Sequence, residues 1–400
     1  MKEVVRSAHL PRGFKFSAVS CGIKASGRLD LGLVEATPGT TATAVFTRNR
    51  VVAAPVEAGR AALVSSRGRL RAVVVNSGNA NCATGKPGLR ACQRISRELA
   101  GLLHVPQEQV FPSSTGIIGV RLPVEKILAK LPALKDAAEP AGIAAFAQAI
   151  MTTDTRPKLA SACFHAGKHE VRVLGVAKGS GMIHPQMATM LVYLFTDAAG
   201  TPSQLKQILR RVCDATFNCI SVDGDTSTND TVLLMASGQS GARLTDAHTT
   251  DKFENSVCDV CQDLSQQIVC DGEGVQHVIH LHVTHAKTRE EALRIARAIA
   301  NSCLVKTAWA GADPNWGRIL AAVGSSGIPL DPNRISIWIA DQMVCRGGVS
   351  CDFDEEKAHQ ALSEPRCKLQ IALQRGTASA QFLATDLTAD YVRINADYST

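Results

Sequence analysis

The sequence has few aromatic side chains, only 4% of its 400 residues, and it contains no apolar stretch longer than a β-strand. A transmembrane helix needs about 20 consecutive apolar residues, so we expect no membrane-spanning segment and no membrane partner. The first 14 residues lack the continuous apolar core of a secretory signal peptide. A cytoplasmic protein is therefore the expectation.

Runs of like charge are also missing. The 43 basic and 36 acidic residues give a net charge of +7, but they are scattered along the chain. Nucleic-acid-binding proteins concentrate basic residues in a patch or stripe, so we expect no nucleic-acid partner. Hydrophobic residues make up 45% of the chain, which is typical of a well-packed globular α/β protein.

A disulfide framework is absent as well. The 13 cysteines are odd in number and occur singly, without a regular spacing, so we interpret them as reduced thiols that pack in the core. Cys258 and Cys261 form one CxxC motif, but no second pair accompanies it and the surrounding residues have helical periodicity. We therefore interpret the two cysteines as neighbours on one helix face.

Two motifs resemble metal sites and fail on closer inspection. A polar loop alternates oxygen-bearing side chains like the start of an EF-hand, at Asp223, Asp225, Ser227 and Asn229. The sixth position is Thr228, where glycine is needed, and the twelfth is Leu234, where a bidentate carboxylate is needed. His280 and His282 share one face of a predicted strand, but no other ligand stands at a suitable spacing, so a solvated face is favoured over zinc. We expect no metal.

Apolar periodicity predicts alternating strands and helices. Residues 70–85 predict a buried strand that ends in a Gly/Asn loop, and residues 86–104 predict an amphipathic helix. Residues 110–122 are interpreted as a short turn-rich stretch, followed by a helix with Pro123 at its first position. Residues 158–179 predict a hairpin. Thr201 and Gln204 form a capping box that opens a helix to about Cys213.

The segment KGSGMIHPQMATML, residues 178–191, combines glycines and a proline with a threonine that opens an apolar run. Taken alone, Thr189 is an ordinary β-branched strand residue. Its setting suggests that the Ala188-Thr189 peptide is strained, so that the hydroxyl could attack the preceding carbonyl and release a chain beginning with Thr189. The new α-amine, with an ordinary pKa of about 7.7–8.0, could then act as base for that hydroxyl.

These residues and many others resemble the ornithine acetyltransferases, also called glutamate N-acetyltransferases, the bifunctional proteins of arginine biosynthesis. The resemblance runs nearly end to end through ordered motifs: CGIKASGRLDLGLV, VVVNSGNAN, SSTGIIG, MTTDTRPK, KGSGMIHPQMATML, SVDGDTSTNDTVLL, CDGEG, DPNWGRILAAVG and INADYST. It implies a layered α/β fold with helices outside β-sheets. It also implies autoproteolysis into an alpha chain, residues 1–188, and a beta chain, residues 189–400, that stay together, with two of each in a heterotetramer.

The resemblance also implies residue roles. Thr189 would be the nucleophile, and Thr115 and Gly116 would form the oxyanion hole. Substrate would be bound by Thr153, Lys178, Thr189, Glu273, Asn395 and Thr400. A cation suits the α-carboxylate that both substrates share, and Lys178 supplies one.

The implied reaction is a ping-pong transfer of the acetyl group from N-acetylornithine to glutamate through acetyl-Thr189, without a metal or organic cofactor. Whether acetyl-CoA also serves as donor stays open. His184, Gln186 and Ala312 depart from the expected pattern, which leaves self-cleavage rate and fine specificity open. Two alternatives remain: an amidohydrolase or aminopeptidase in which water is the acceptor, and an uncut binding protein.

Overall fold

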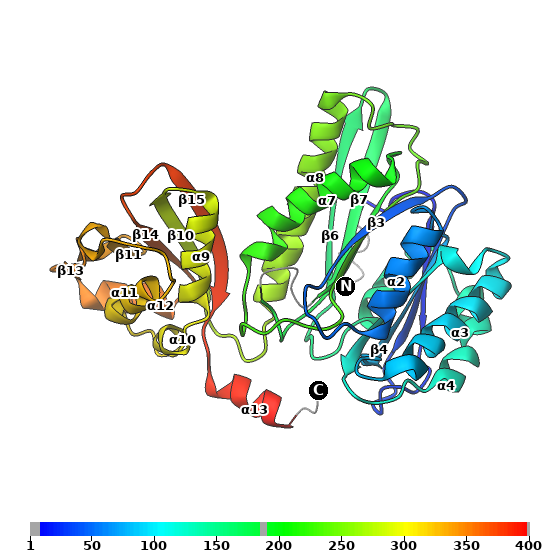
Figure 1. The fold of residues 1–400 in the computed structure, drawn as a ribbon, viewed down its shortest axis with the longest axis horizontal. Coiled ribbons are helices and arrows are strands. Elements are labelled where there is room, and N and C mark those ends of the chain that lie inside the picture. Colours follow the sequence, from blue (N-terminus) through cyan, green and yellow to red (C-terminus); the bar gives the residue numbers. More distant parts are fainter. Residues whose placement is uncertain (1–8, 185–189, 398–400) are drawn as a thin grey trace.

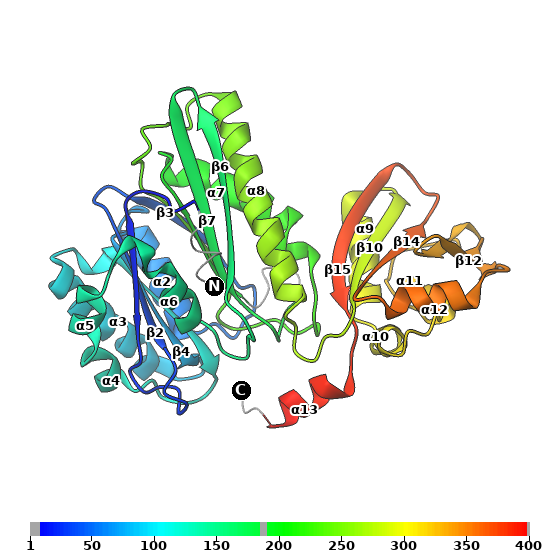
Figure 2. The same ribbon diagram turned by 180° about the vertical axis from the view of Figure 1, so that it is seen from behind.

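The computed structural model describes residues 9–184 and 190–397. These residues form two unequal lobes (Figure 1). The large lobe contains two β-sheets and the small lobe contains a third, and helix α13 (Ala389–Asp397) runs from the small lobe back beneath the large one (Figure 2).

Two sheets pack face to face in the large lobe. The four-stranded sheet has the order β1 (Phe14–Val19), β2 (Leu31–Ala36), β4 (Ala72–Asn79), β5 (Val110–Ile117). The five-stranded sheet has the order β3 (Thr41–Phe46), β9 (Thr231–Ala236), β8 (Leu191–Thr196), β7 (His169–Lys178), β6 (Lys158–Ala166). Side chains from both sheets share one core; the rings of Phe16 and Phe195, for example, are 5.1 Å apart between centroids.

Helices cover the outer faces of this sandwich. The four-stranded sheet packs against α3 (Gly85–Leu103), α4 (Val124–Leu128) and α5 (Leu131–Asp136). The five-stranded sheet packs against α7 (Pro202–Ala215) and α8 (Ala247–Val269). Helices α2 (Ala54–Ser65) and α6 (Ile143–Ala149) pack beside β5 and β1 respectively. The expected layered α/β fold with helices outside the sheets is therefore confirmed.

The small lobe is a mixed six-stranded sheet with helices on one face. Its strand order is β13 (Val349–Ser350), β12 (Gln342–Arg346), β11 (Ser336–Ile339), β14 (Arg366–Ala372), β10 (Val278–Ala286), β15 (Ala378–Thr385). Its helices are α9 (Arg289–Ala300), α10 (Cys303–Ala310), α11 (Trp316–Gly324) and α12 (Glu355–Ser363). They share a core with Ile279, Leu281 and Val283, whereas His280 and His282 occupy the opposite, half-buried face.

Most local predictions agree with these elements, including the hairpin of β6 and β7 and the capping box at Thr201. The turn-rich interpretation of residues 110–122 was wrong, because most of the stretch forms β5. β5 is an edge strand, where Pro112 can be accommodated without the loss of a ladder hydrogen bond. Pro123 caps α4, which begins at Val124, rather than occupying its first turn. No helix in the described ranges is long and apolar enough to cross a membrane.

Candidate functional site

A pocket of about 220 Å³ lies where β5 and β7 end and where α13 returns to the large lobe. It is lined by all the expected site residues that the structure describes: Thr115, Gly116, Thr153, Lys178, Glu273 and Asn395. Ala188, Thr189 and Thr400 lie outside the described residues. The sequence therefore predicted a set of residues that the fold does bring together, from positions up to 280 apart in the chain.

The Thr115-Gly116 pair lies at the end of β5, beside the parallel strand β4. Gly116 has φ +132°, and a Cβ there would lie 2.4 Å from the carbonyl carbon of Gly78. Both the backbone angle and the close approach therefore require glycine. The Lys178 ammonium donates to the Thr115 hydroxyl oxygen over 3.4 Å, and both residues line the pocket.

Lys178 is the last residue of β7, and its register partner is Leu191, the first residue of β8. β8 is the central strand of its sheet. Burial lowers the pKa of Lys178, while Asp154 raises it. The ammonium is thus held in a desolvated place where an anionic ligand would be bound strongly.

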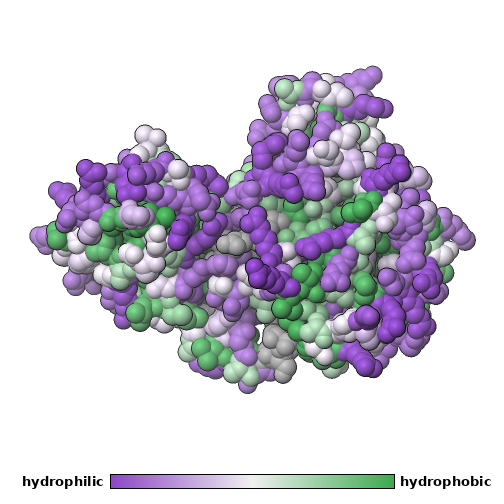
Figure 3. All heavy atoms as spheres, in the orientation of Figure 1, coloured by the Kyte–Doolittle hydropathy of each residue, from purple (hydrophilic) through white to green (hydrophobic). Residues whose placement is uncertain are grey.

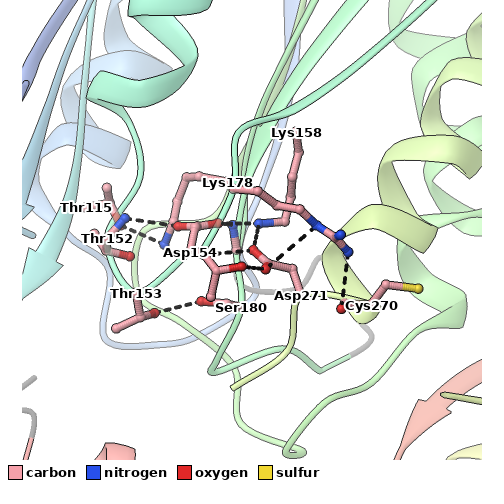
Figure 4. Close-up of polar contacts among 12 residues, drawn as sticks. Thr115, Thr152, Thr153, Asp154, Lys158, Lys178, Ser180, Cys270 and Asp271 are labelled. Carbon is pink, nitrogen blue, oxygen red and sulfur yellow. Dashed lines mark hydrogen bonds and ion pairs between the residues drawn. The ribbon is translucent and has the colours of Figure 1, made fainter. Parts of the chain in front are cut away.

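A buried network of ion pairs lies next to Lys178 and contacts the backbone of the following residue (Figure 4). The Lys158 ammonium, which is fully buried, donates to Asp154 over 2.7 Å and to Asp271 over 2.5 Å. Asp154 also accepts the backbone N–H of Gly179, over 2.7 Å. Burial alone would raise the pKa of Asp154, but the charges of Lys178 and Lys158 lower it to about 2. The network therefore fixes the backbone on which Lys178 stands.

Glu273 and Asn395 form the opposite wall of the pocket. The Asn395 amide donates to the Glu273 carboxylate over 2.9 Å, although the two residues are 122 positions apart. The backbone N–H of Glu273 donates to the carbonyl of Ser180 over 2.9 Å, and the Ser180 hydroxyl lies 2.7 Å from that of Thr153. A carboxylate and an ammonium, from Glu273 and Lys178, thus line one small pocket.

The loop that superficially resembled a calcium site forms another wall, and sequence reasoning missed this role. Asp223 accepts the backbone N–H groups of Met182 and Ile183, the latter over 2.8 Å, and so anchors the chain that precedes residues 185–189. Asn229 donates to the carbonyls of Ala80 and Ser114. The alternating polar side chains signalled an ordered loop, but only the tertiary fold turns that loop toward the pocket.

Asp230 is a second residue that the sequence did not single out. It is buried, and it accepts the backbone N–H of Met190, the residue that follows Thr189 in the chain. Burial raises its pKa well above the usual value, despite the opposing effects of this hydrogen bond and of the Lys178 charge. A buried carboxyl therefore holds the start of the segment leading into β8.

The cysteine and histidine pairs do not take part in this pocket. Cys258 and Cys261 are free thiols on α8, as the helical interpretation predicts. His280 and His282 face a separate cavity between α8 and the small-lobe sheet. Neither pair belongs to a group of possible metal ligands in the described part of the chain.

The pH dependence of stability should report on Asp223, because burial raises its pKa from 3.8 to about 6. The contribution of Asp223 to the free energy of unfolding is then fully present below about pH 4, where the carboxyl is protonated. It is lost as the pH rises through 6. The free energy of unfolding, measured relative to Asp223→Asn by urea denaturation, should fall by up to about 3 kcal/mol between pH 4 and pH 7. Asp341→Asn, at an exposed carboxyl, is the control. If the difference in unfolding free energy between the natural chain and Asp223→Asn changed with pH no more than the difference between the natural chain and Asp341→Asn, this expectation would be contradicted.

Similarity to known proteins extends over nearly the whole chain. The ArgJ family profile matches residues 15–400. The chain belongs to the ArgJ family. This membership confirms the resemblance drawn from the motifs, and with it the expected acyltransferase class in arginine biosynthesis.

The chain is similar to several individual ArgJ proteins. The arginine biosynthesis bifunctional protein ArgJ of Thermus thermophilus is 48% identical over 98% of this chain and 100% of its own length. The protein of that name from Thermotoga neapolitana is 43% identical over 98% and 100%. A crystal structure of Bacillus halodurans ArgJ is 41% identical over 50% of this chain and 96% of its own, with a TM-score of 0.49. A structure of ornithine acetyltransferase complexed with ornithine, from Mycobacterium tuberculosis, is 38% identical over 44% of this chain and 93% of its own, with a TM-score of 0.39.

The unusual residues relative to the family pattern lie in different places. His184 is half-buried, with a ring nitrogen 3.2 Å from the Asn301 amide, and burial lowers its pKa. Ala312 is buried in the small lobe, with φ +51°, and does not line the pocket. Gln186 lies outside the described residues. Of the departures that the structure describes, only His184 adjoins the segment before Thr189.

Proposed function

We propose that this ArgJ chain transfers the acetyl group of N-acetylornithine to glutamate through an acetyl-Thr189 intermediate. The observation that carries the proposal is the pocket itself, in which a buried ammonium, a carboxylate and the Thr115-Gly116 pair converge beside the strand that follows Thr189. Its volume of about 220 Å³ suits ligands the size of an amino acid. The Lys178 ammonium would bind the substrate α-carboxylate, and Glu273 would bind the ornithine ammonium.

Catalysis then needs few groups. The Thr189 hydroxyl attacks the acetyl carbonyl and passes its proton to the α-amine of the same residue. The oxyanion receives hydrogen bonds from the Thr115 hydroxyl and from backbone N–H at Gly116. Ornithine leaves with a proton, and the amine of glutamate attacks the threonine ester to complete the transfer. Thr153, Asn395 and Thr400 complete the substrate site, and the reaction requires no metal or organic cofactor.

The same proposal includes self-cleavage between Ala188 and Thr189, which would give chains of residues 1–188 and 189–400. β7 and β8 pair over six residues on either side of the cut, so the products would stay joined by the sheet. We further propose a cytoplasmic heterotetramer with two copies of each chain. Relatives bear the name bifunctional, and we propose acetyl-CoA as a second acetyl donor for glutamate.

Intact-mass analysis of the purified protein beside Thr189→Ala tests the nucleophile. We expect two fragments from the natural sequence, the second beginning at Thr189, and one unbroken chain from the variant. Thr153→Ala is a matched control that removes a pocket hydroxyl and should still be cut. One unbroken chain in every sample would overturn the proposal and support an uncut binding protein.

A product assay with N-acetylornithine and glutamate then tests the acceptor. We expect acetylglutamate to accumulate at the rate at which ornithine appears. Acetate released faster than acetylglutamate at saturating glutamate would instead support the amidohydrolase alternative.

A further inference from the structure

A groove with a volume of about 1,070 Å³ lies outside the proposed acetyl-transfer pocket. Its floor is β3, an edge strand, and its walls are α2 on one side and α7 on the other (Figure 1). In the same orientation, Figure 3 shows apolar surface crossed and bordered by hydrophilic atoms in this region. The groove is large enough for a ligand much bigger than an amino acid.

Five cations line this groove: Arg48, Arg60, Arg67, Lys206 and Arg210. None of them forms an ion pair with any described residue. Asp214 is the one carboxylate in the lining, and it already accepts a hydrogen bond from the Asn218 amide over 2.7 Å. By contrast Arg211, which does not line the groove, is paired with Glu254. The groove therefore carries an uncompensated positive charge that favours an anionic occupant.

The arrangement of these cations suits phosphate. They stand on both walls and at one end of the floor, so a ligand lying along β3 would meet cations from two directions. An arginine guanidinium can donate two parallel hydrogen bonds to two oxygens of one phosphate. Pro202 and Ser203, the first residues of α7, also line the groove, and the positive end of a helix dipole adds to the attraction.

Apolar surface lies beside the charges. Phe46, Leu63 and Val64 line the same groove, and Val64 is 78% exposed. The Arg60 guanidinium lies over the Phe46 ring, 5.1 Å from its centre, so the two form a stacked pair in the lining of the groove. A ligand with both an anionic part and a flat apolar part would use these features together.

Two other occupants fit less well. A peptide strand added to β3 would need a free edge, but the N–H of Ala42 already donates to the carbonyl of Gly68, which shortens that edge. A second copy seated on this groove, with a twofold axis through the groove itself, would bring the two sets of five cations close together, and like charges repel.

We propose that this groove binds a nucleotide diphosphate, with the diphosphate between the α2 and α7 cations and the base over the apolar floor. Two hydrogen bonds join the end of this groove to a loop of the acetyl-transfer pocket. Thr47 and Asn49, which flank Arg48, donate side-chain hydrogen bonds to the carbonyls of Ser227 and Thr226. Ser227 lines the smaller pocket. The inference goes beyond the proposed acetyl transfer and does not require it.

Isothermal titration of the full chain with ADP tests the proposal, with adenosine and inorganic pyrophosphate as part-ligands. We expect ADP to bind more tightly than either part. Lys206→Glu should weaken ADP binding by about tenfold or more, since it removes a charge-assisted contact and adds repulsion. Arg97→Glu, an exposed cation on α3 away from the groove, should leave binding within about twofold.

The proposal would be overturned if ADP did not bind at millimolar concentration, or if Lys206→Glu bound ADP as tightly as the natural chain. It would also be overturned if adenosine or inorganic pyrophosphate bound as tightly as ADP. The transfer from N-acetylornithine to glutamate is measured on the same preparations. Lys206 and Arg97 lie outside the acetyl-transfer pocket, so both variants should retain that activity. Absence of transfer in all samples would contradict the proposed function and leave the titration result standing.

Discussion

Replacing Lys158 with methionine is expected to lower the free energy of unfolding by about 3–5 kcal/mol. The Lys158 ammonium is fully buried between Asp154 and Asp271, which are 0% and 3% exposed. Methionine fills a similar volume but leaves two carboxylates without their shared cation. Such charges are costly in a desolvated place, so the loss exceeds what packing alone would predict. Urea denaturation at pH 7 measures it.

Lys357→Met provides the control for this substitution. Lys357 also pairs with an aspartate, Asp354, over 3.1 Å, but its side chain is 64% exposed. Exposed pairs contribute about 0–1 kcal/mol, so little change is expected. Equal losses in the two variants would show that burial of the Lys158 network adds nothing to stability.

Gly116→Ala is expected to lower kcat for acetyl transfer by at least about a hundredfold. The new Cβ would lie 2.4 Å from the carbonyl carbon of Gly78 and 2.5 Å from the amide nitrogen of Asn79. Both are backbone atoms of β4, so β5 has to shift and carries the Thr115 hydroxyl with it. Loss of one oxyanion donor costs about 10²–10³ in kcat, and the shift affects both proposed donors.

Gly119→Ala separates this contact from backbone strain. Gly119 also has a positive φ, +83°, but an added Cβ there would meet nothing within 4 Å. Its variant should lose about 1 kcal/mol of stability at most and keep its kcat. A kcat for Gly116→Ala close to that of Gly119→Ala would remove the Thr115-Gly116 pair from the mechanism, whereas a rise in KM alone would assign it to substrate binding.

Local patterns in the sequence predicted those elements whose cause is local. Apolar and polar residues alternate in residues 158–179, and a turn separates the two strands, which suffices to predict the β6–β7 hairpin. The Thr201 capping box suffices to predict the start of α7. β5 was missed because its Ser and Thr residues read as turn formers. Its pairing with β4 comes from a parallel crossover through α3, which a local pattern does not show.

Some residues of the candidate site could likewise be predicted from the sequence, and others could not. The expected residues came from ordered motifs, and the pocket brings the described ones together. The Lys158 network could not be predicted, because Asp271 is 113 positions away and a lysine at the start of a strand is ordinarily exposed. Asp223 and Asp230 were missed for a related reason: the sequence showed a polar loop, but the direction in which its side chains point depends on the packing of both lobes.

The strand order of the five-stranded sheet has a consequence for biosynthesis. β3, β7 and β6 precede the proposed cut, whereas β9 and β8 follow it and lie between them. Neither half could complete this sheet before the other was translated, so the proposed cleavage would follow the folding of the whole polypeptide. A gene divided at this point would not encode two independently foldable proteins, because each product would expose the strand edges and core residues that the other normally covers.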